Sequence, residues 1–217
     1  ILGNAGAKLL FADSEMLGVV EDLPGLVLLD AAAQSDPTRL VPPGTPVPPV
    51  APRQDGDLFR LMYTSGTTDR PKGVMHTYRN FYWKCMEHAV ALALGPQDRL
   101  LMVGPLYHVG SFDLPGLGVL WMGGTLCILR DFDAAEAVAA IARERLTGAW
   151  MAPVMLSRTL EHGNPDGLDL TSLKWCIGGG EKTPEGRIRE FSKLFTGGRY
   201  IDAYGLTETC SGDTLME

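Results

Sequence analysis

The segment from 63 to 73 holds the densest group of ligand-binding side chains in the sequence. It reads YTSGTTDRPKG, so four Ser or Thr hydroxyls, two glycines and Lys72 lie within ten positions. Glycine lets the backbone approach a ligand closely, successive backbone N–H groups form an anion-binding nest, and lysine adds a charge-assisted hydrogen bond. The segment therefore predicts a loop that binds a polyphosphate. Because Gly73 follows Lys72 where Ser or Thr would be required, a P-loop kinase or GTPase is disfavoured.

The longer run from 63 to 80, YTSGTTDRPKGVMHTYRN, resembles the phosphate loop of the AMP-forming adenylating enzymes, whose usual pattern is [YF]TSG[ST]TGxPKG. This family includes the acyl- and aryl-CoA synthetases, firefly luciferase and the adenylation domains of peptide synthetases. The sequence departs from the pattern at Asp69, where glycine is usual. Aspartate tolerates left-handed backbone better than most residues, so the turn remains compatible with the sequence, but a negative charge would lie near the bound phosphates.

Three further segments resemble motifs of the same family and follow in the expected order. The segment 105–110, PLYHVG, is similar to PL[FY]HxxG, although its glycine comes one position early. The segment 177–181, IGGGE, is a glycine-rich turn between a predicted strand and a predicted helix, which is where α/β sheets bind ligands. The segment 202–208, DAYGLTE, is similar to [ND]xYGxTE. The resemblance covers essentially the whole chain.

The resemblance implies a separate role for each side chain of the last motif. Tyr204 would offer a flat face to adenine, as aromatic rings do to bases. Gly205 would permit close approach, and the Thr207 hydroxyl would bind the α-phosphate. Glu208 would hold Mg²⁺, a cation that prefers oxygen ligands, with Thr64 as a second ligand on the metal side.

The same resemblance implies three sets of site residues. Catalytic roles fall to Lys72, Thr207 and Glu208. Nucleotide binding is assigned to Thr64, Ser65, Gly66, Thr67, Thr68, Lys72, Gly179, Gly180, Glu181, Asp202, Ala203, Tyr204, Gly205 and Thr207. A pocket for the acid substrate is assigned to His108, Val109, Met151, Ile177, Gly178 and Gly179, with Tyr107, Trp150, Met155 and Gly180 as further candidates.

The implied reaction has two steps and uses ATP, Mg²⁺ and CoA. A carboxylate attacks the α-phosphorus of ATP to give an acyl-adenylate and pyrophosphate, and the thiol of CoA then displaces AMP. A carboxylate is already a nucleophile at pH 7, so no general base is needed. The candidate pocket residues are mostly apolar, which favours fatty or aromatic acids. Two alternatives stay open: an adenylation domain that loads a carrier protein, and, because of Asp69, a non-catalytic nucleotide-binding homologue.

The elements that must position these residues alternate between short apolar runs and amphipathic helices. This alternation predicts an α/β fold with layered, mostly parallel sheets flanked by helices. The predicted strands are 8–11, 26–29, 58–63, 100–103, 125–129, 149–151, 174–177 and 200–203.

Three helices are predicted, over 78–94, 133–146 and 184–195. Asp133 followed by Glu136 three residues later predicts a capping box at the second helix. Thr183 followed by Pro184 predicts an N-cap and a first helical residue for the third.

Six prolines between Val41 and Pro52 predict an extended linker. It would separate a segment of the distal subdomain (1–40) from a portion that holds the phosphate loop and the acyl and adenine sites (53–217). By resemblance, both belong to part of the large N-terminal AMP-binding domain. The C-terminal domain of the family lies outside the chain, so we expect the chain alone to be inactive.

Composition narrows the choice of partners and compartment. The chain has 217 residues and a net charge of −7, which weighs against nucleic acid as a partner. The longest uncharged stretch, 114–129, contains a proline and four glycines and is too short for a membrane span. The four cysteines form no metal or disulfide pattern, which indicates reduced thiols and a cytoplasmic location. A homodimer is a candidate assembly.

Overall fold

The computed structural model of the chain describes residues 1–13, 18, 25–29, 41, 43–65 and 70–217. The chain forms two compact units. The first comprises Ile1–Gln54 and Tyr63–Gly73, and the second comprises Asp55–Met62 and Val74–Glu217. The phosphate-loop segment thus groups with the N-terminal residues, whereas the other three motifs belong to the second unit.

The first unit contains a short helix and two parallel strands. They are α1 (Leu2–Ala5), β1 (Leu10–Asp13) and β2 (Leu26–Leu29), and Leu10 pairs with Leu26. β2 matches its predicted range, and β1 begins two residues later than predicted. The proline-rich stretch 43–52 contains neither helix nor strand, and its residues are exposed.

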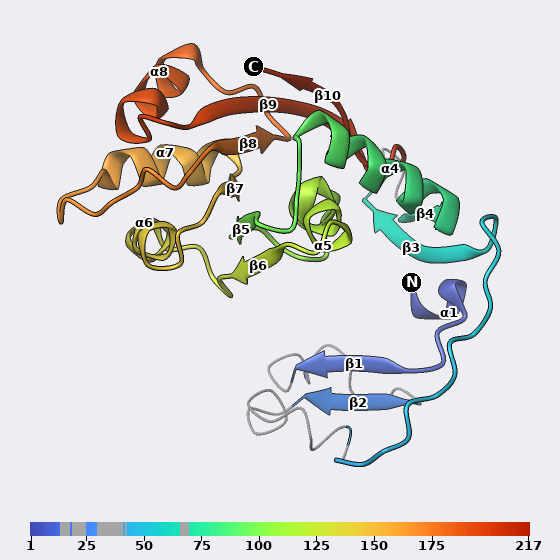
Figure 1. The fold of residues 1–217 in the computed structure, drawn as a ribbon. Helices are drawn as coiled ribbons and strands as arrows, with labels where there is room; N and C mark the ends of the chain where they lie inside the picture. Colours follow the sequence, from blue (N-terminus) through green and yellow to red (C-terminus); the bar gives the residue numbers. More distant parts are fainter. Residues whose placement is uncertain (14–17, 19–24, 30–40, 42, 66–69) are drawn as a thin grey trace. The chain divides into compact units, whose positions relative to one another are not determined.

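A six-stranded sheet forms the centre of the second unit, in the order β10-β9-β8-β7-β5-β6 (Figure 1). All neighbouring pairs are parallel except β9 and β10. The prediction of a mostly parallel α/β fold is confirmed. The strands are β5 (Arg99–Met102), β6 (Thr125–Ile128), β7 (Gly148–Trp150), β8 (Trp175–Gly179), β9 (Arg199–Leu206) and β10 (Ser211–Met216).

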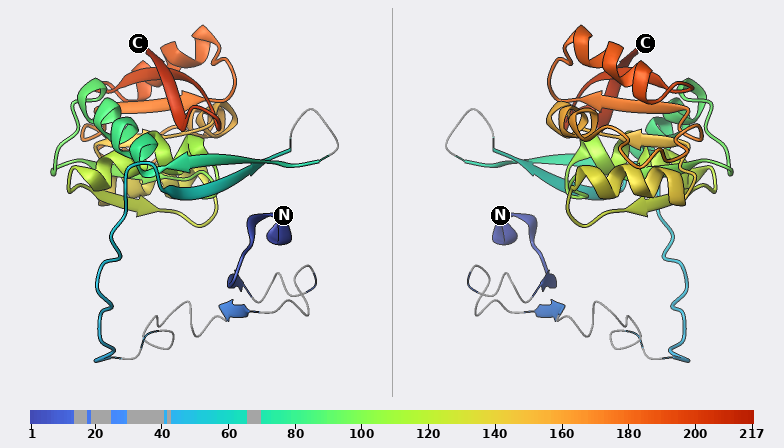
Figure 2. Two further views of the ribbon diagram at one scale, coloured as in Figure 1. Left: turned by 90° about the vertical axis from the view of Figure 1, so that its right-hand side faces the viewer. Right: turned by 90° about the vertical axis from the view of Figure 1, so that its left-hand side faces the viewer.

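Helices cover both faces of this sheet because successive side chains of each strand point to opposite faces. On one face, Leu101, Ala149 and Cys176 pack against α6, α7 and α8 (Figures 1 and 2). On the other face, Leu100 and Ile177 pack against Leu114 and other residues of the opposite layer. The helices are α4 (Tyr78–Ala91), the π-helix η3 (Val109–Leu117), α5 (Gly118–Trp121), α6 (Ala134–Arg143), α7 (Pro153–His162) and α8 (Glu185–Leu194).

Local capping explains where the predicted helices begin. The Asp133 side chain accepts the Glu136 backbone N–H at 2.8 Å, as the sequence predicts for α6. The predicted cap at Thr183 is wrong, because Pro184 occupies the N-cap position of α8. Thr183 is instead buried, and its hydroxyl lies 2.6 Å from that of Tyr200. A buried tyrosine hydroxyl needs a hydrogen-bond partner, and Thr183 serves Tyr200 in this way instead of capping α8.

A separate two-stranded sheet leads into α4. It consists of β3 (Leu58–Thr64) and β4 (Lys72–Thr77), of which β4 was not predicted. α4 begins with a capping box between Thr77 and Asn80. It ends at Ala91, three residues before its predicted end.

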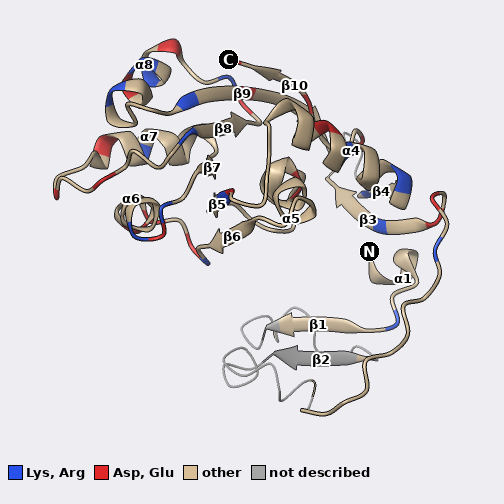
Figure 3. Cartoon of the chain, viewed as in Figure 1, with Lys and Arg blue, Asp and Glu red and all other residues tan. Residues whose placement is uncertain are grey.

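The surface carries mixed charge. Basic and acidic segments are interspersed over α6, α7 and α8 (Figure 3). Exposed ion pairs such as Arg143–Glu136 and Arg187–Glu161 join them. The four cysteines are free thiols. No helix in the described part of the chain has the length and hydropathy needed to cross a membrane.

Candidate functional site

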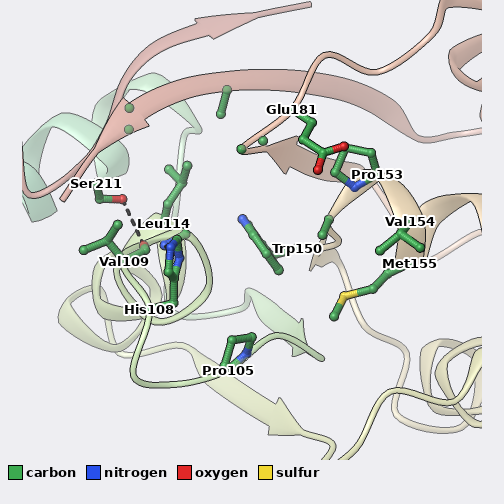
Figure 4. Close-up of a pocket in the computed structure, with 17 residues that line it drawn as sticks. Pro105, His108, Val109, Leu114, Trp150, Pro153, Val154, Met155, Glu181 and Ser211 are labelled. Carbon is green, nitrogen blue, oxygen red and sulfur yellow. Dashed lines mark hydrogen bonds between the residues drawn. The ribbon is translucent and has the colours of Figure 1, made fainter. Parts of the chain in front are cut away.

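A cavity of about 350 Å³ opens beyond the carboxyl ends of the parallel strands (Figure 4). This edge of the sheet is where α/β proteins bind ligands. Its wall is almost entirely apolar, and the charged residue among its lining, Glu181, is exposed. The lining residues are Pro105, His108, Val109, Gly110, Leu114, Trp150, Ala152, Pro153, Val154, Met155, Gly179, Gly180, Glu181, Ala203, Gly205, Ser211 and Gly212.

The indole of Trp150 forms the inner wall of this cavity. A Cβ atom at Gly104 would lie 2.4 Å from its Cζ3, and one at Gly110 would lie 3.0 Å from its Cζ2. The two glycines therefore make room for the ring. The indole N–H is buried and has no hydrogen-bond partner among the described residues. Trp150 thus lines the cavity while its indole N–H stays buried.

His108 stands at the start of η3 and lines the same cavity (Figure 4). Its Nδ1 accepts the Gly110 backbone N–H at 3.0 Å. In the neutral ring the proton must then lie on Nε2, which leaves one donor. Val109 also lines the cavity, whereas the neighbouring Tyr107 is 82% exposed and does not.

Three residues assigned to the acid pocket from the sequence lie elsewhere. Met151 and Ile177 are fully buried in the cores on opposite faces of the sheet. A Cβ atom at Gly178 would lie 1.7 Å from the Tyr200 hydroxyl oxygen, so this glycine makes room for a buried tyrosine. Burial raises the pKa of Tyr200, which keeps its hydroxyl protonated. Gly179 and Gly180 do line the cavity.

Replacing Gly178 with alanine is expected to lower the free energy of unfolding by about 1–3 kcal/mol, because the new methyl group overpacks against Tyr200. The matched control is Gly186→Ala in α8, where a Cβ atom meets nothing within 4 Å. That control is expected to stabilise the protein by about 0.4–1 kcal/mol. Urea unfolding followed by tryptophan fluorescence measures both. Equal effects of the two substitutions would contradict this role for Gly178.

The segment from Asp202 to Gly205 runs along β9 beside the cavity. Ala203 and Gly205 line it, and Tyr204 is exposed. A Cβ atom at Gly205 would lie 1.9 Å from the Ser211 carbonyl oxygen, so pairing of β9 with β10 already requires glycine here. Burial raises the pKa of Asp202, and its Oδ1 has no partner among the described residues.

A tight turn from 207 to 210 connects β9 to β10. Within and just after it, Cys210 and Ser211 have positive φ angles of 60° and 108°. Each such non-glycine residue costs about 1–3 kcal/mol and persists only where its surroundings impose it. Side chains from other elements supply these contacts. Lys84 donates to the Gly212 carbonyl at 2.7 Å, and the Ser211 hydroxyl donates to the Val109 carbonyl at 3.3 Å (Figure 4).

Glu208 lies on this turn with its carboxylate exposed. It borders a shallow depression with Arg79 and Lys84, but no described residue forms an ion pair with it. No group of three or more His, Cys, Asp or Glu residues in the described ranges could hold a metal ion. The single exposed carboxylate of Glu208 nevertheless fits Mg²⁺, which is commonly bound by one or two carboxylates together with substrate phosphates and water.

The phosphate-loop residues are only partly described. Gly66, Thr67, Thr68 and Asp69 lie outside the described residues. Thr64 ends β3, Ser65 is exposed, and the exposed Lys72 begins β4.

Sequence reasoning missed several residues of this region. Leu114, Ala152, Pro153 and Val154 of the cavity come from η3 and from the start of α7. Proline at the first position of a helix, as at Pro153, was the available signal for α7. Arg60, His76 and Asp113 form a polar cluster next to the turn at Thr207. Arg60 and Asp113 lie outside every motif, and His76 lies in the 63–80 run but at a position to which no role was assigned.

Known proteins resemble the chain over essentially its whole length. The family model described as AMP-binding enzyme matches residues 1–216. The chain is 31% identical over 217 residues to a feruloyl-CoA synthase from Amycolatopsis sp, covering all of this chain and 43% of that protein. It is 30% identical over 222 residues to the long-chain-fatty-acid–CoA ligase FadD13 from Mycobacterium tuberculosis, again covering all of this chain and 43% of that protein. The chain thus spans less than half the length of these relatives.

Solved structures also resemble the chain over essentially its whole length. The N-terminal domain of FACL13 from Mycobacterium tuberculosis superposes with a TM-score of 0.82 at 27% identity, covering 100% of this chain and 55% of that one. O-succinylbenzoate CoA synthetase (MenE) from Bacillus subtilis, in complex with AMP, superposes with a TM-score of 0.81 at 26% identity, covering 99% of this chain and 42% of that one. The resemblance found in the sequence motifs is confirmed, and the chain belongs to the AMP-binding enzyme family.

Proposed function

We propose that the polypeptide carrying this chain activates a carboxylic acid with ATP to an acyl-adenylate and then transfers the acyl group to CoA. One observation carries the proposal. The apolar cavity and the turn with Thr207 and Glu208 share strand β9, whose Ala203 and Gly205 line the cavity just before the turn. An acid in the cavity and a nucleotide at the turn would therefore meet at one strand end. The named relatives, which include CoA ligases, support this assignment.

Adenylate formation requires that the acid and the nucleotide be oriented and that the charge developing on the phosphate be stabilised. Bringing the acid carboxylate and the α-phosphorus together reduces the entropic cost of reaction, and donors placed around the phosphate stabilise the charge that develops there. In this proposal the Thr207 hydroxyl and Lys72 donate to phosphate oxygens, and Glu208 holds Mg²⁺. The bound Mg²⁺ supplies neutralisation of phosphate charge. Asp202, on the same strand as Ala203 and Gly205, takes part in binding the nucleotide.

The cavity favours aromatic acids as substrates. It is mostly apolar, about 350 Å³ in volume, and is lined in part by Trp150. Aromatic rings pack against one another in offset or edge-to-face contacts worth about 0.5–1.5 kcal/mol beyond burial. Among the described lining residues, the exposed Glu181 is the one carboxylate, so none of them on the inner wall would pair with the ammonium group of an amino acid.

The deciding experiment measures acid-dependent ATP–pyrophosphate exchange and CoA thioester formation. It uses the complete polypeptide that carries this sequence, with aryl, fatty and amino acids as substrates and Mg²⁺ present. We expect exchange with aryl acids and thioester formation with CoA. Transfer to a carrier protein but not to CoA would favour an adenylation domain. Nucleotide binding without exchange for any acid would favour the non-catalytic homologue.

Trp150→Phe tests whether this cavity holds the acid. Loss of the larger ring adds space at the inner wall, so kcat/KM for a bicyclic aryl acid is expected to rise about 10-fold relative to benzoate, the scale of small size changes in an apolar pocket. Trp83→Phe is the matched control, because Trp83 is 63% exposed on α4 and does not line the cavity. An unchanged preference in Trp150→Phe would place the acid elsewhere.

Assembly and location are part of the same proposal. We infer a cytoplasmic protein that forms a homodimer. Light scattering on the purified protein and fractionation of cells test these two points.

A further inference from the structure

A buried polar cluster links four separate segments of the second unit. Arg60 on β3 donates through Nη1 to Asp113 on η3 at 3.0 Å and makes a second contact with it through Nη2. Arg60 also donates through Nε to Nδ1 of His76 on β4 at 3.0 Å. Nε2 of His76 lies 2.7 Å from the carbonyl oxygen of Thr207. His76 and Asp113 are 1% and 2% exposed.

These partners fix the protonation state of His76. An arginine can only donate, so Nδ1 must accept and carries no proton. A carbonyl oxygen can only accept, so Nε2 must carry the proton. His76 is therefore a neutral imidazole in one tautomer. Phe81 packs against this arrangement, with its ring 5.8 Å from that of His76 and 4.6 Å from the Arg60 guanidinium carbon.

The hydrogen bond from His76 ends on the turn that carries Thr207 and Glu208. The Thr207 carbonyl also accepts the Cys210 backbone N–H at 3.1 Å, so both of its lone pairs are used. The turn contains Cys210 and is followed by Ser211, both in the left-handed region, so it needs fixed contacts to hold this shape. His76 is the side chain that holds it at Thr207 itself.

The same cluster reaches the cavity. Asp113 belongs to η3, whose Val109 and Leu114 line the cavity wall. The Ser211 hydroxyl makes a second link by donating to the Val109 carbonyl. The cavity wall on η3 and the turn at Thr207 are therefore joined by two hydrogen-bonded links, one through Arg60 and His76 and one through Ser211.

We propose that His76, held in a single tautomer by Arg60 and the Thr207 carbonyl, is a positioning residue that fixes the Thr207–Glu208 turn relative to the acid cavity for adenylate formation. Asp113 holds Arg60 in place for this role. The role in adenylate formation rests on the proposed function. His76 touches no substrate, so it acts through the Thr207 backbone.

The test compares His76→Gln, His76→Phe and the control His88→Phe in the complete polypeptide. Glutamine keeps one acceptor and one donor, whereas phenylalanine keeps the ring and removes both. His88 is equally buried at 1% exposure on α4, but its ring nitrogens have no partner among the described residues. In acid-dependent ATP–pyrophosphate exchange, we expect His76→Phe to lower kcat about 10- to 100-fold with KM for the acid within about 3-fold. His76→Gln and His88→Phe are expected to stay within about 3-fold of the parent protein in kcat.

Two further measurements test the role of His76 even if His76→Phe folds poorly. Nitrogen NMR of the parent protein is expected to show a protonated Nε2 and a bare Nδ1 on His76. Calorimetry with Mg·ATP is expected to show weaker binding by His76→Gln than by the parent protein, but stronger binding than by any folded His76→Phe. A parent-like kcat in His76→Phe, a His76→Gln as impaired as His76→Phe, or the opposite tautomer overturns the proposal. Absence of exchange in the parent protein itself instead defeats the proposed function, and the tautomer and Mg·ATP affinities still decide the role of His76.

Discussion

Replacing Glu208 with glutamine is expected to lower acid-dependent ATP–pyrophosphate exchange by about 10²–10³-fold, the range for losing one electrostatic stabiliser of a transition state. The carboxylate is exposed and no described residue pairs with it, so its charge is available to a cation bound with the nucleotide. Glutamine is similar in size but neutral, and it binds Mg²⁺ less well. The half-saturating Mg²⁺ concentration should rise together with the loss of kcat.

The loss of activity in Glu208→Gln is expected without a loss of stability. Surface substitutions outside special features usually change the free energy of unfolding by about 0.5 kcal/mol or less, so Glu208→Gln should unfold like the parent protein. The control is Glu161→Gln on α7, which neutralises another exposed glutamate that lies in an ion pair with Arg187. It should leave exchange unchanged. Full activity in Glu208→Gln at low Mg²⁺ would remove Glu208 from the metal site.

Replacing Asp113 with leucine is expected to lower the free energy of unfolding by about 3 kcal/mol, the lower end of the range for breaking a buried ion pair. The Arg60 side chain is 18% exposed and Asp113 is 2% exposed, so Arg60 would keep a largely buried charge without its counterion. Burial raises the pKa of Asp113 above its ordinary value even though Arg60 faces it. The attraction to Arg60 thus does not fully offset the desolvation of the Asp113 carboxylate.

The double variant Arg60→Met with Asp113→Leu is expected to regain most of this loss, to within about 1 kcal/mol of the parent protein, because apolar replacement of a buried pair is often neutral. Urea unfolding of the two single variants and the double variant gives the coupling energy. The exchange activity of the double variant should nevertheless remain low, since His76 has lost the Arg60 donor that fixes its ring. If the losses from the two single substitutions simply add, the pair is not coupled.

Local signals predicted much of the fold. The buried strands β5, β8 and β9 were readable because strands covered on both faces form continuous apolar runs. α6 was readable from Asp133 and Glu136 at its start. β4 was missed because Lys72–Thr77 overlaps the phosphate-loop motif, and β10 because Ser211–Met216 contains glycine and aspartate. Neither segment carries the apolar run of a fully buried strand.

The lining of the cavity was predictable mainly where it coincided with motifs, although Trp150 and Met155 were named from the sequence without one. His108, Val109 and Gly179, which were assigned to the acid pocket, lie in motif segments and line the cavity. Glu181, which was assigned to nucleotide binding, also lines it. Ile177 belongs to β8 and Met151 directly follows β7, where alternation decides which face each side chain meets, and their sequence neighbourhood does not reveal this. The cluster of Arg60, His76 and Asp113 depends on register between distant segments, which a single sequence does not specify.

The contacts that hold the Thr207–Glu208 turn also have a consequence for biosynthesis. Arg60 and Asp113 are 53 positions apart, and His76 and Thr207 are 131 positions apart. Contacts between such distant positions form slowly because the entropy of closing a long loop is lost before they are gained. On the ribosome, β3, β4 and η3 emerge well before residue 207. The arginine–aspartate pair can therefore assemble first, and the turn is fastened to it only near the end of translation of this segment.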